Sequence, residues 1–278
     1  MSRKRLFQMT LLGIKQFKDP YYQGFAAELA FYFLLSIVPI LIVLSQFLGF
    51  FSISLEALGG FINQYVSSDA AEFLYDFISY SPTGAMNVFL ILTALWSASR
   101  AQFSMMRIAN YTITAGRVSG RGYFRDRLRA IKTIIFTLFT VTFSLIILVY
   151  GELLLKVAIT AITKTLHINF EPVFFWLFIR WPIAMTLYFL MVSYNYYVLP
   201  YERVQFRAIL PGSVFASVTM LLVTLVYTRY TKYIANYDII YGSLASVVAL
   251  LFWFFFLSWA LWLGVLFNKV WADTKEID

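Results

Sequence analysis

One helical face of an apolar stretch near the N-terminus carries residues that can move a proton or contact a polar substrate. Spaced at i, i+4, i+8 and i+11, they are Glu28, Tyr32, Ser36 and Pro39. A carboxylate inside an apolar helix is costly unless it faces a bundle interior or water, and the carbonyl freed by a proline needs the same surroundings. The face therefore predicts a substrate or proton path, with Glu28 as the titrating group. The alternative is that Glu28 reaches the polar interface or pairs with an arginine such as Arg100.

A second charged residue within an apolar stretch is Arg180, beside Trp181 and Pro182. A guanidinium at that depth requires a carboxylate, a phosphate or water. Arg180 is predicted either to pair with Glu152 or to contact a lipid headgroup from the outer leaflet, and the residue types leave both open. The predicted substrate path as a whole comprises Glu28, Tyr32, Ser36, Pro39, Arg100 and Arg180.

Polar residues also gather toward the ends of two other apolar stretches. Glu152 and Lys156 stand at i and i+4, so they are predicted to form an ion pair on one helical face. Further along, a polar and aromatic segment is a candidate outer recognition surface, formed by Arg229, Asn236, Asp238 and Tyr241. Tyrosines are also expected in the aromatic belt at a membrane interface, which is the alternative for this segment.

The residue types predict neither a catalytic nor a metal centre. The sequence contains one histidine, His167, and no cysteine, and its 14 Asp and Glu residues are mostly dispersed. A zinc site needs clustered His, Cys or carboxylate ligands, and a serine hydrolase needs a Ser-His-Asp chain. The Gly-Lys-Ser/Thr ending of a nucleotide-binding loop is missing as well. We therefore expect no enzyme activity, no cofactor and no metal.

The elements that position these residues follow from the composition. Of 278 residues, 61% are hydrophobic, 20% are aromatic and only 13% are charged, which indicates a chain whose solvent is the bilayer. At roughly 20 residues for each crossing, we predict a single membrane domain over residues 1–278, an all-α integral membrane protein with a bundle of about six transmembrane helices and amphipathic interfacial helices. The predicted spans cover residues 25–50, 86–99, 133–155, 173–199, 208–227 and 243–267.

The second predicted span is the shortest. Its strictly apolar core runs from Val88 to Ala98, which is too short to cross about 30 Å of hydrocarbon. It spans the membrane only if the helix continues past Arg100 through Met105 and Met106. The alternative is a re-entrant segment.

Charge in the connections predicts the orientation of the chain. Segment 1–20 is basic, segment 52–84 contains acidic residues but no Lys or Arg, and segment 100–132 is again basic. Because Lys and Arg are enriched on the cytoplasmic side, both termini are predicted to face the cytoplasm. The same rule accounts for the net charge of +8, so nucleic-acid binding is not expected.

These three segments have predicted roles of their own. Segment 1–20 is interpreted as a basic helix on the membrane surface, and segment 52–84 as an outer amphipathic segment that caps a cavity or merely covers helix ends. Segment 100–132 is predicted to be a basic cytoplasmic loop, whose glycine-rich turn could hold a phosphate or simply be solvated. The predicted anionic-lipid contacts are Arg117, Arg121 and Arg125.

Short motifs, in order along nearly the whole chain, resemble the YihY/BrkB family of bacterial inner-membrane proteins. The two most recognisable are Ala27-Glu28-Leu29-Ala30-Phe31-Tyr32 and Leu95-Trp96-Ser97-Ala98-Ser99-Arg100. Further matching positions are Arg121-Gly122-Tyr123-Phe124, Leu199-Pro200, Arg203, Phe206-Arg207, Pro211-Gly212, Tyr241-Gly242-Ser243-Leu244-Ala245, Trp253 and Gly264.

The resemblance implies a polytopic inner-membrane protein, with links in the family to virulence and to export of lipids or envelope precursors. The historical ribonuclease label of the family implies tRNA processing, against which the missing metal-ligand clusters speak. Where relatives often have Gly-Ala-Glu near the end of the last span, this chain has Gly264-Val265-Leu266, so any role of that carboxylate is lost or moved.

We expect transport of a lipid or another amphipathic envelope molecule between leaflets, and the alternative is a non-catalytic scaffold or assembly factor. The expected partners are membrane lipids, especially anionic headgroups, together with an envelope protein or a second copy of the chain.

Overall fold

The structure is a computed structural model that describes residues 2–22, 24–50, 84–118, 120, 122–137, 139–140, 172–233 and 245–275. Within these ranges it describes the side chains of all residues except 38–50, 87, 90, 94, 172–177, 180, 231–233, 245 and 246. The regular elements of these ranges are all helices. The all-α part of the prediction is therefore confirmed.

In chain order the elements are α1 (Arg3–Phe17), the short 3-10 helix η1 (Pro20–Tyr22), α2 (Phe25–Phe50), α5 (Ala85–Ile113), α7 (Pro172–Val198), α8 (Phe206–Tyr233) and α10 (Ala245–Asp273). Helices α2, α7, α8 and α10 overlap four of the predicted spans over most of their length. Residues 123–137 and 139–140 are helical as well. Long apolar runs form helices because a helix satisfies its own backbone hydrogen bonds. The rest of the third predicted span lies outside the described residues, as does segment 52–83.

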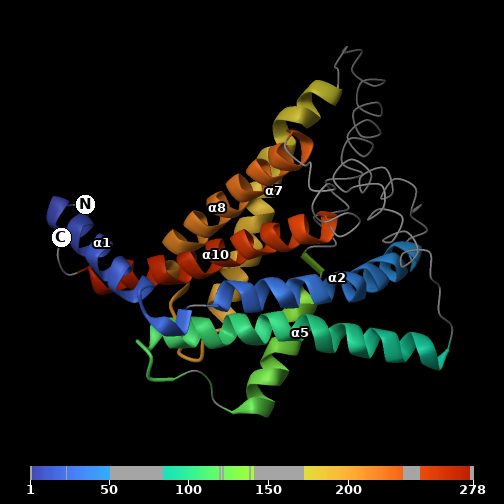
Figure 1. Cartoon of the computed structure of the whole chain (residues 1–278), viewed down its shortest axis with the longest axis horizontal. Coiled ribbons are helices and arrows are strands. Elements are labelled where there is room, and N and C mark those ends of the chain that lie inside the picture. Colours follow the sequence, from blue (N-terminus) through green and yellow to red (C-terminus); the bar gives the residue numbers. More distant parts are fainter. Residues whose placement is uncertain are drawn as a thin grey trace, which may run out of the picture.

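Helix α10 lies at the centre of the bundle. It packs against α8 on one side and against α2 and α5 on the other, while α7 packs chiefly against α8 (Figure 1). The largest buried side chains come from both sides of this arrangement and include Trp262 of α10, Leu29 of α2 and Met106 of α5. The core is thus continuous through α10.

Much of the outer surface of these helices is apolar. Exposed fractions reach 79% for Phe178 on α7, 68% for Val226 on α8 and 61% for Phe89 on α5. Two described helices, Phe206–Tyr230 and Val247–Asp273, are long and apolar enough to cross a membrane. These observations support a membrane protein, whereas the count of six spans and the orientation stay predictions.

Helices α8 and α10 cross with their backbones in close contact at Gly212 and Gly264. A Cβ on Gly212 would overlap the carbonyl oxygen of Gly264, and a Cβ on Gly264 would lie 2.7 Å from that of Ala216. Small residues at such crossings let two helices approach and gain van der Waals contact. The two glycines therefore set the distance between α8 and α10.

Helix α5 is longer than its predicted span. It runs without interruption through Arg100 to Ile113 over 29 residues, about 43 Å at the α-helical rise, as the continued-helix alternative required. The predicted loop 100–132 is correspondingly shorter, because the next helix begins at residue 123. The polar residues there suggested a loop, but several, such as Gln102 and Asn110, are buried between helices.

The two termini lie beside one another at one end of the bundle (Figure 1). Helix α1 packs on α10 through Arg5, a buried residue whose Nη2 donates to the carbonyl of Trp271 at 3.4 Å. The Arg5 guanidinium also lies 4.4 Å from the centre of the Trp271 ring. Away from α10, α1 exposes Phe7 and Leu11, so its position on a membrane surface stays a prediction.

Candidate functional site

The first residue of the predicted path, Glu28, forms an ion pair. It lies in the first turn of α2, where the helix dipole favours a carboxylate. Its Oε1 accepts a hydrogen bond from Nη2 of Arg107 on α5, and the two side chains are 35% and 39% exposed. The partner is therefore Arg107 and not Arg100, which lies about two turns earlier on the same helix.

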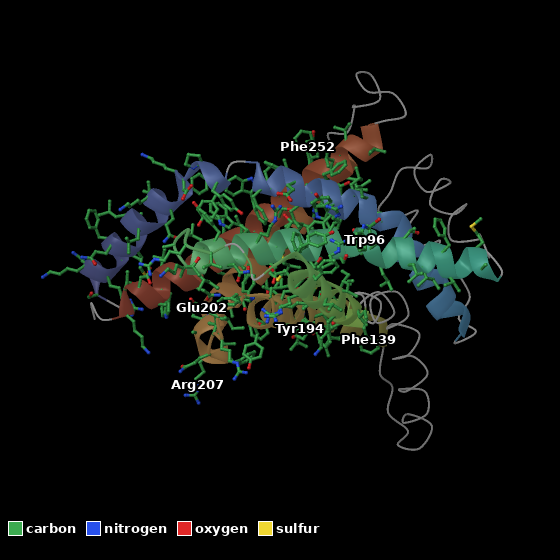
Figure 2. The ribbon with its side chains drawn as sticks, turned by 90° about the horizontal axis from the view of Figure 1, so that it is seen from below. Trp96, Phe139, Tyr194, Glu202, Arg207 and Phe252 are labelled. Atoms are coloured by element: carbon green, nitrogen blue, oxygen red, sulfur yellow. The ribbon has the colours of Figure 1, made fainter. Side chains whose placement is uncertain are left out.

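One face of α5 carries aromatic and basic side chains in alternation. At i, i+4, i+7 and i+11 they are Trp96, Arg100, Phe103 and Arg107, a spacing that places all four on one side of a helix. Figure 2 shows Trp96 on α5 next to α2, and the two helices pack along one another. This face therefore borders the α2 residues that the sequence singled out.

Arg127, on the helix that begins at residue 123, completes this region and was missed by the sequence analysis. Only 4% of Arg127 is exposed. Its Cζ lies 3.9 Å from the centre of the Trp96 ring, and its Nη2 donates to the Trp96 carbonyl at 2.9 Å. Within the described ranges, its Nε has no hydrogen-bond partner and no carboxylate pairs with it.

The surroundings of Arg127 bring three elements together. Burial lowers the pKa of Arg127, and the nearby positive charge of Arg100 lowers it further, whereas Tyr123 and Tyr32 act in the opposite direction. The side chain of Arg127 therefore lies where its own helix meets α2 and α5. We define the arginine cluster as Glu28, Tyr32, Trp96, Arg100, Arg107, Tyr123 and Arg127.

The arginine cluster holds an excess of positive charge. It contains three guanidinium groups and one carboxylate, that of Glu28, which pairs with Arg107. Arg100 is exposed, and it makes no hydrogen bond or ion pair with any residue that the structure describes. Guanidinium groups in such surroundings can bind an anion with several oxygens through charge-assisted hydrogen bonds.

The other α2 residues of the predicted path differ in their availability. Tyr32 is half-buried and lies near Arg127. Ser36 is buried, and its hydroxyl donates to the carbonyl of Phe33 at 2.8 Å, so it is already satisfied within its own helix. Pro39 lies inside α2, which continues through it, and its side chain is outside the described part.

Most of the other predicted site residues cannot be compared with the structure. The backbone of Arg180 lies within α7, whereas its side chain is not among those described. Arg229 is exposed on α8, and Arg117 and Arg125 are exposed near the connection 114–122. Residues outside the described ranges are Glu152, Lys156, Asn236, Asp238, Tyr241 and Arg121.

A buried polar junction also escaped the sequence analysis. The hydroxyl of Thr137 accepts from Gln102 Nε2 of α5 at 3.1 Å and from Asn195 Nδ2 of α7 at 3.4 Å. It donates in turn to the carbonyl of Thr133 at 3.0 Å. The junction therefore joins α5, α7 and the helix from residue 123.

Beside η1 lies a group of tyrosines around Asp19. The Asp19 carboxylate accepts from the hydroxyl of Tyr111 at 3.0 Å, and this hydrogen bond raises the pKa of Tyr111. Burial raises the pKa of Tyr22 to about 12.

Among the described residues no group of three or more His, Cys, Asp or Glu could hold a metal ion.

Comparison with known proteins gives a family match over most of the chain. The family described as "Virulence factor BrkB" matches residues 14–277. The chain is 27% identical over 260 residues to the ribonuclease-like protein YfkH of Bacillus subtilis, covering 92% of each chain. It is 26% identical over 243 residues to a UPF0761 membrane protein of Pseudoalteromonas translucida, covering 84% of this chain and 75% of that protein. No solved structure matches it significantly.

Proposed function

Because the chain belongs to the BrkB family of membrane proteins, we propose that it moves a lipid or another amphipathic envelope molecule between the leaflets of the bacterial cytoplasmic membrane. The observation that carries the proposal is the arginine cluster, a partly exposed charged site in a helical bundle with an apolar outer surface. Charged residues in such bundles mark substrate or ion paths by default.

The cluster offers contacts suited to both parts of an amphipathic molecule. Arg100 is exposed and available to a polar headgroup, while Trp96 is 48% exposed and offers an aromatic surface to an acyl chain. The Glu28–Arg107 ion pair lies between α2 and α5 and is partly open to solvent. It would therefore loosen or re-form as a headgroup passes.

Other parts of the chain have supporting roles in this proposal. The basic residues of α1 and of the connection 114–122 would attract anionic lipids to the cytoplasmic face, and Arg180 would meet the headgroup from the outer half. The sequence lacks a nucleotide-binding motif, so movement would be passive, coupled to an ion or driven by a partner protein.

The ribonuclease-like name of one relative does not enter the proposal. Cleavage of RNA needs a general acid and base or bound metal ions close to a phosphodiester. In the described part of the chain the carboxylate of the arginine cluster, that of Glu28, pairs with Arg107. The described residues therefore suggest neither a general acid and base nor a set of metal ligands. A preparation free of contaminating nucleases that cleaves RNA would contradict this view.

The test is flux of fluorescent anionic and zwitterionic lipids across liposomes that contain the purified protein. Glu28→Gln and Arg180→Ala are expected to reduce flux at least several-fold while the protein stays folded. Asp273→Asn is the matched control for Glu28→Gln, because it also neutralises the carboxylate of an ion pair, that with Lys269 on α10. Wild-type flux no higher than in empty liposomes would overturn the proposal and favour a scaffold that co-purifies with a partner.

A further inference from the structure

The guanidinium of Arg127 is short of compensating negative charge. An arginine keeps its proton under all physiological conditions, so burial leaves a full positive charge with little water around it. The contacts that the structure provides are the ring and the carbonyl of Trp96. A cation over an aromatic face gains some energy, but this does not replace a hydrogen bond to Nε, which is buried and open within the described ranges.

The other arginines of the cluster increase this imbalance. Arg100 adds a second positive charge near Arg127, and no described residue pairs with it. The Nη2 of Arg107 donates a hydrogen bond to Glu28, but the buried Nε of Arg107 also lacks a partner in the described part of the chain. Like charges close to one another are unfavourable unless an anion joins them.

We propose that Arg100 and Arg127 form a binding site for a phosphate group, with Trp96 as its aromatic wall. A phosphomonoester and inorganic phosphate both carry this group. The inference rests on the proposed function only in taking a lipid headgroup as the natural source of the phosphate, which is then the group that the transported molecule carries.

Phosphate fits this site better than a carboxylate does. Its oxygens lie on several sides, so it can accept from guanidinium groups on different helices, and arginine forks bind phosphate through paired hydrogen bonds. A phosphomonoester carries about −1.5 to −2 charges at neutral pH, which balances the charges of Arg100 and Arg127, since Glu28 offsets that of Arg107. Tyr32 and Tyr123, which lie near Arg127, would border the phosphate.

The test measures binding and not transport. The full-length protein in phosphatidylcholine nanodiscs is titrated with phosphatidic acid, with diacylglycerol, which lacks the phosphate, and with inorganic phosphate. We expect the wild type to bind phosphatidic acid and not diacylglycerol. Arg100→Gln and Arg127→Gln should weaken binding by roughly 10- to 100-fold, as expected for the loss of charge-assisted hydrogen bonds. Because Arg100 is exposed, its variant should fold even if that of Arg127 does not.

Arg207→Gln is the matched control, since it removes the same charge from an exposed position at the start of α8. It should change binding less than about twofold, because a general attraction to anionic surfaces falls little with one charge. Arg127→Lys should bind more weakly than the wild type, because lysine keeps the charge but loses the planar fork.

The experiment distinguishes a lipid headgroup from free phosphate as the ligand. It also distinguishes the phosphate site from the proposed lipid transport. Competition by inorganic phosphate supports the site and indicates that free phosphate can occupy it, whereas binding of phosphatidic acid without such competition supports a lipid ligand. Equal binding by Arg100→Gln and wild type, or equal binding of diacylglycerol, overturns the site. Binding of phosphatidic acid by a protein that gives no lipid flux keeps the site and rejects the transport function.

Discussion

The backbone N–H of Gly212 in α8 donates a hydrogen bond of 2.6 Å to the side-chain oxygen of Asn268 in α10. At the same crossing the buried hydroxyl of Tyr196 in α7 donates to the carbonyl of Leu261 in α10. Backbone and side-chain polar groups of three helices are thus satisfied where the helices come closest. The crossing therefore joins α7 and α8 to α10.

Replacing Gly264 by alanine is predicted to destabilise this crossing. The added Cβ would overlap the hydroxyl of Tyr196 and meet the Cβ of Ala216 at 2.7 Å, so α8 and α10 would have to separate. Overpacking of this kind costs about 1–3 kcal/mol, which should appear as a lower midpoint of thermal unfolding in detergent. Gly13→Ala in α1 is the control, because its Cβ would meet no atom within 4 Å and alanine is the better helix former. Equal effects of the two substitutions would contradict the packing argument.

The junction around Thr137 should be similarly sensitive to the loss of a hydroxyl. Thr137→Val keeps the shape of the side chain but leaves Nε2 of the buried Gln102 without its acceptor, whereas Nδ2 of Asn195 keeps its hydrogen bond to the carbonyl of Met191. Unpaired buried polar groups cost about 1–3 kcal/mol, so the free energy of unfolding should fall by that amount. The control is Thr186→Val, since among the described residues the exposed hydroxyl of Thr186 bonds only to the carbonyl of Pro182 in its own helix. A fall of the same size in the control would assign the effect to helix propensity.

The helices could be predicted from the sequence because their signal is local. The first predicted span coincides with α2, since an uninterrupted apolar run bounded by polar residues specifies a membrane helix within its own length. The extent of α5 was underestimated beyond Arg100 because its buried polar residues, such as Gln102 and Asn110, do not distinguish a helix interior from a loop.

The arginine cluster could be predicted only in part, because it depends on how helices are aligned with one another. Glu28 and Tyr32 were found from their spacing on one helix, but the choice of Arg107 over Arg100 as the partner of Glu28 depends on the packing of α2 against α5. Arg127 was counted with the charges of a basic loop. The available signal was its spacing of i+4 from Tyr123 at the start of a helix that enters an apolar stretch.

Docking of α1 on α10 is predicted to depend on Arg5. Arg5→Ala removes the contacts of the guanidinium with the ring and carbonyl of Trp271. It also removes the methylene groups of the arginine side chain, which contribute apolar packing. Amide hydrogen exchange in residues 3–17 should become at least several-fold faster, while exchange in α8 stays unchanged. Lys4→Ala removes a neighbouring but exposed charge and should leave exchange near the wild-type rate. Unchanged exchange in Arg5→Ala would show that α1 is held by its apolar contacts alone.

Stability should fall at high pH through the ionisation of Tyr22. Burial raises the pKa of Tyr22 from its ordinary value of 10.0 to about 12 in the folded protein, so the unfolded chain loses this proton first. The contribution of Tyr22 to stability is therefore fully present below pH 10 and is lost as the pH rises from about 10 to 12. Two pKa units correspond to about 2.7 kcal/mol.

Thermal unfolding followed between pH 8 and 12 tests this dependence. Tyr22→Phe keeps the buried ring but has no proton to lose, so its midpoint should fall less steeply above pH 10 than that of the wild type. Absorbance near 295 nm reports the ionised tyrosines directly, and the variant should lack a transition near pH 12. Parallel curves for the two proteins would show that Tyr22 ionises in the folded state as readily as in the unfolded chain.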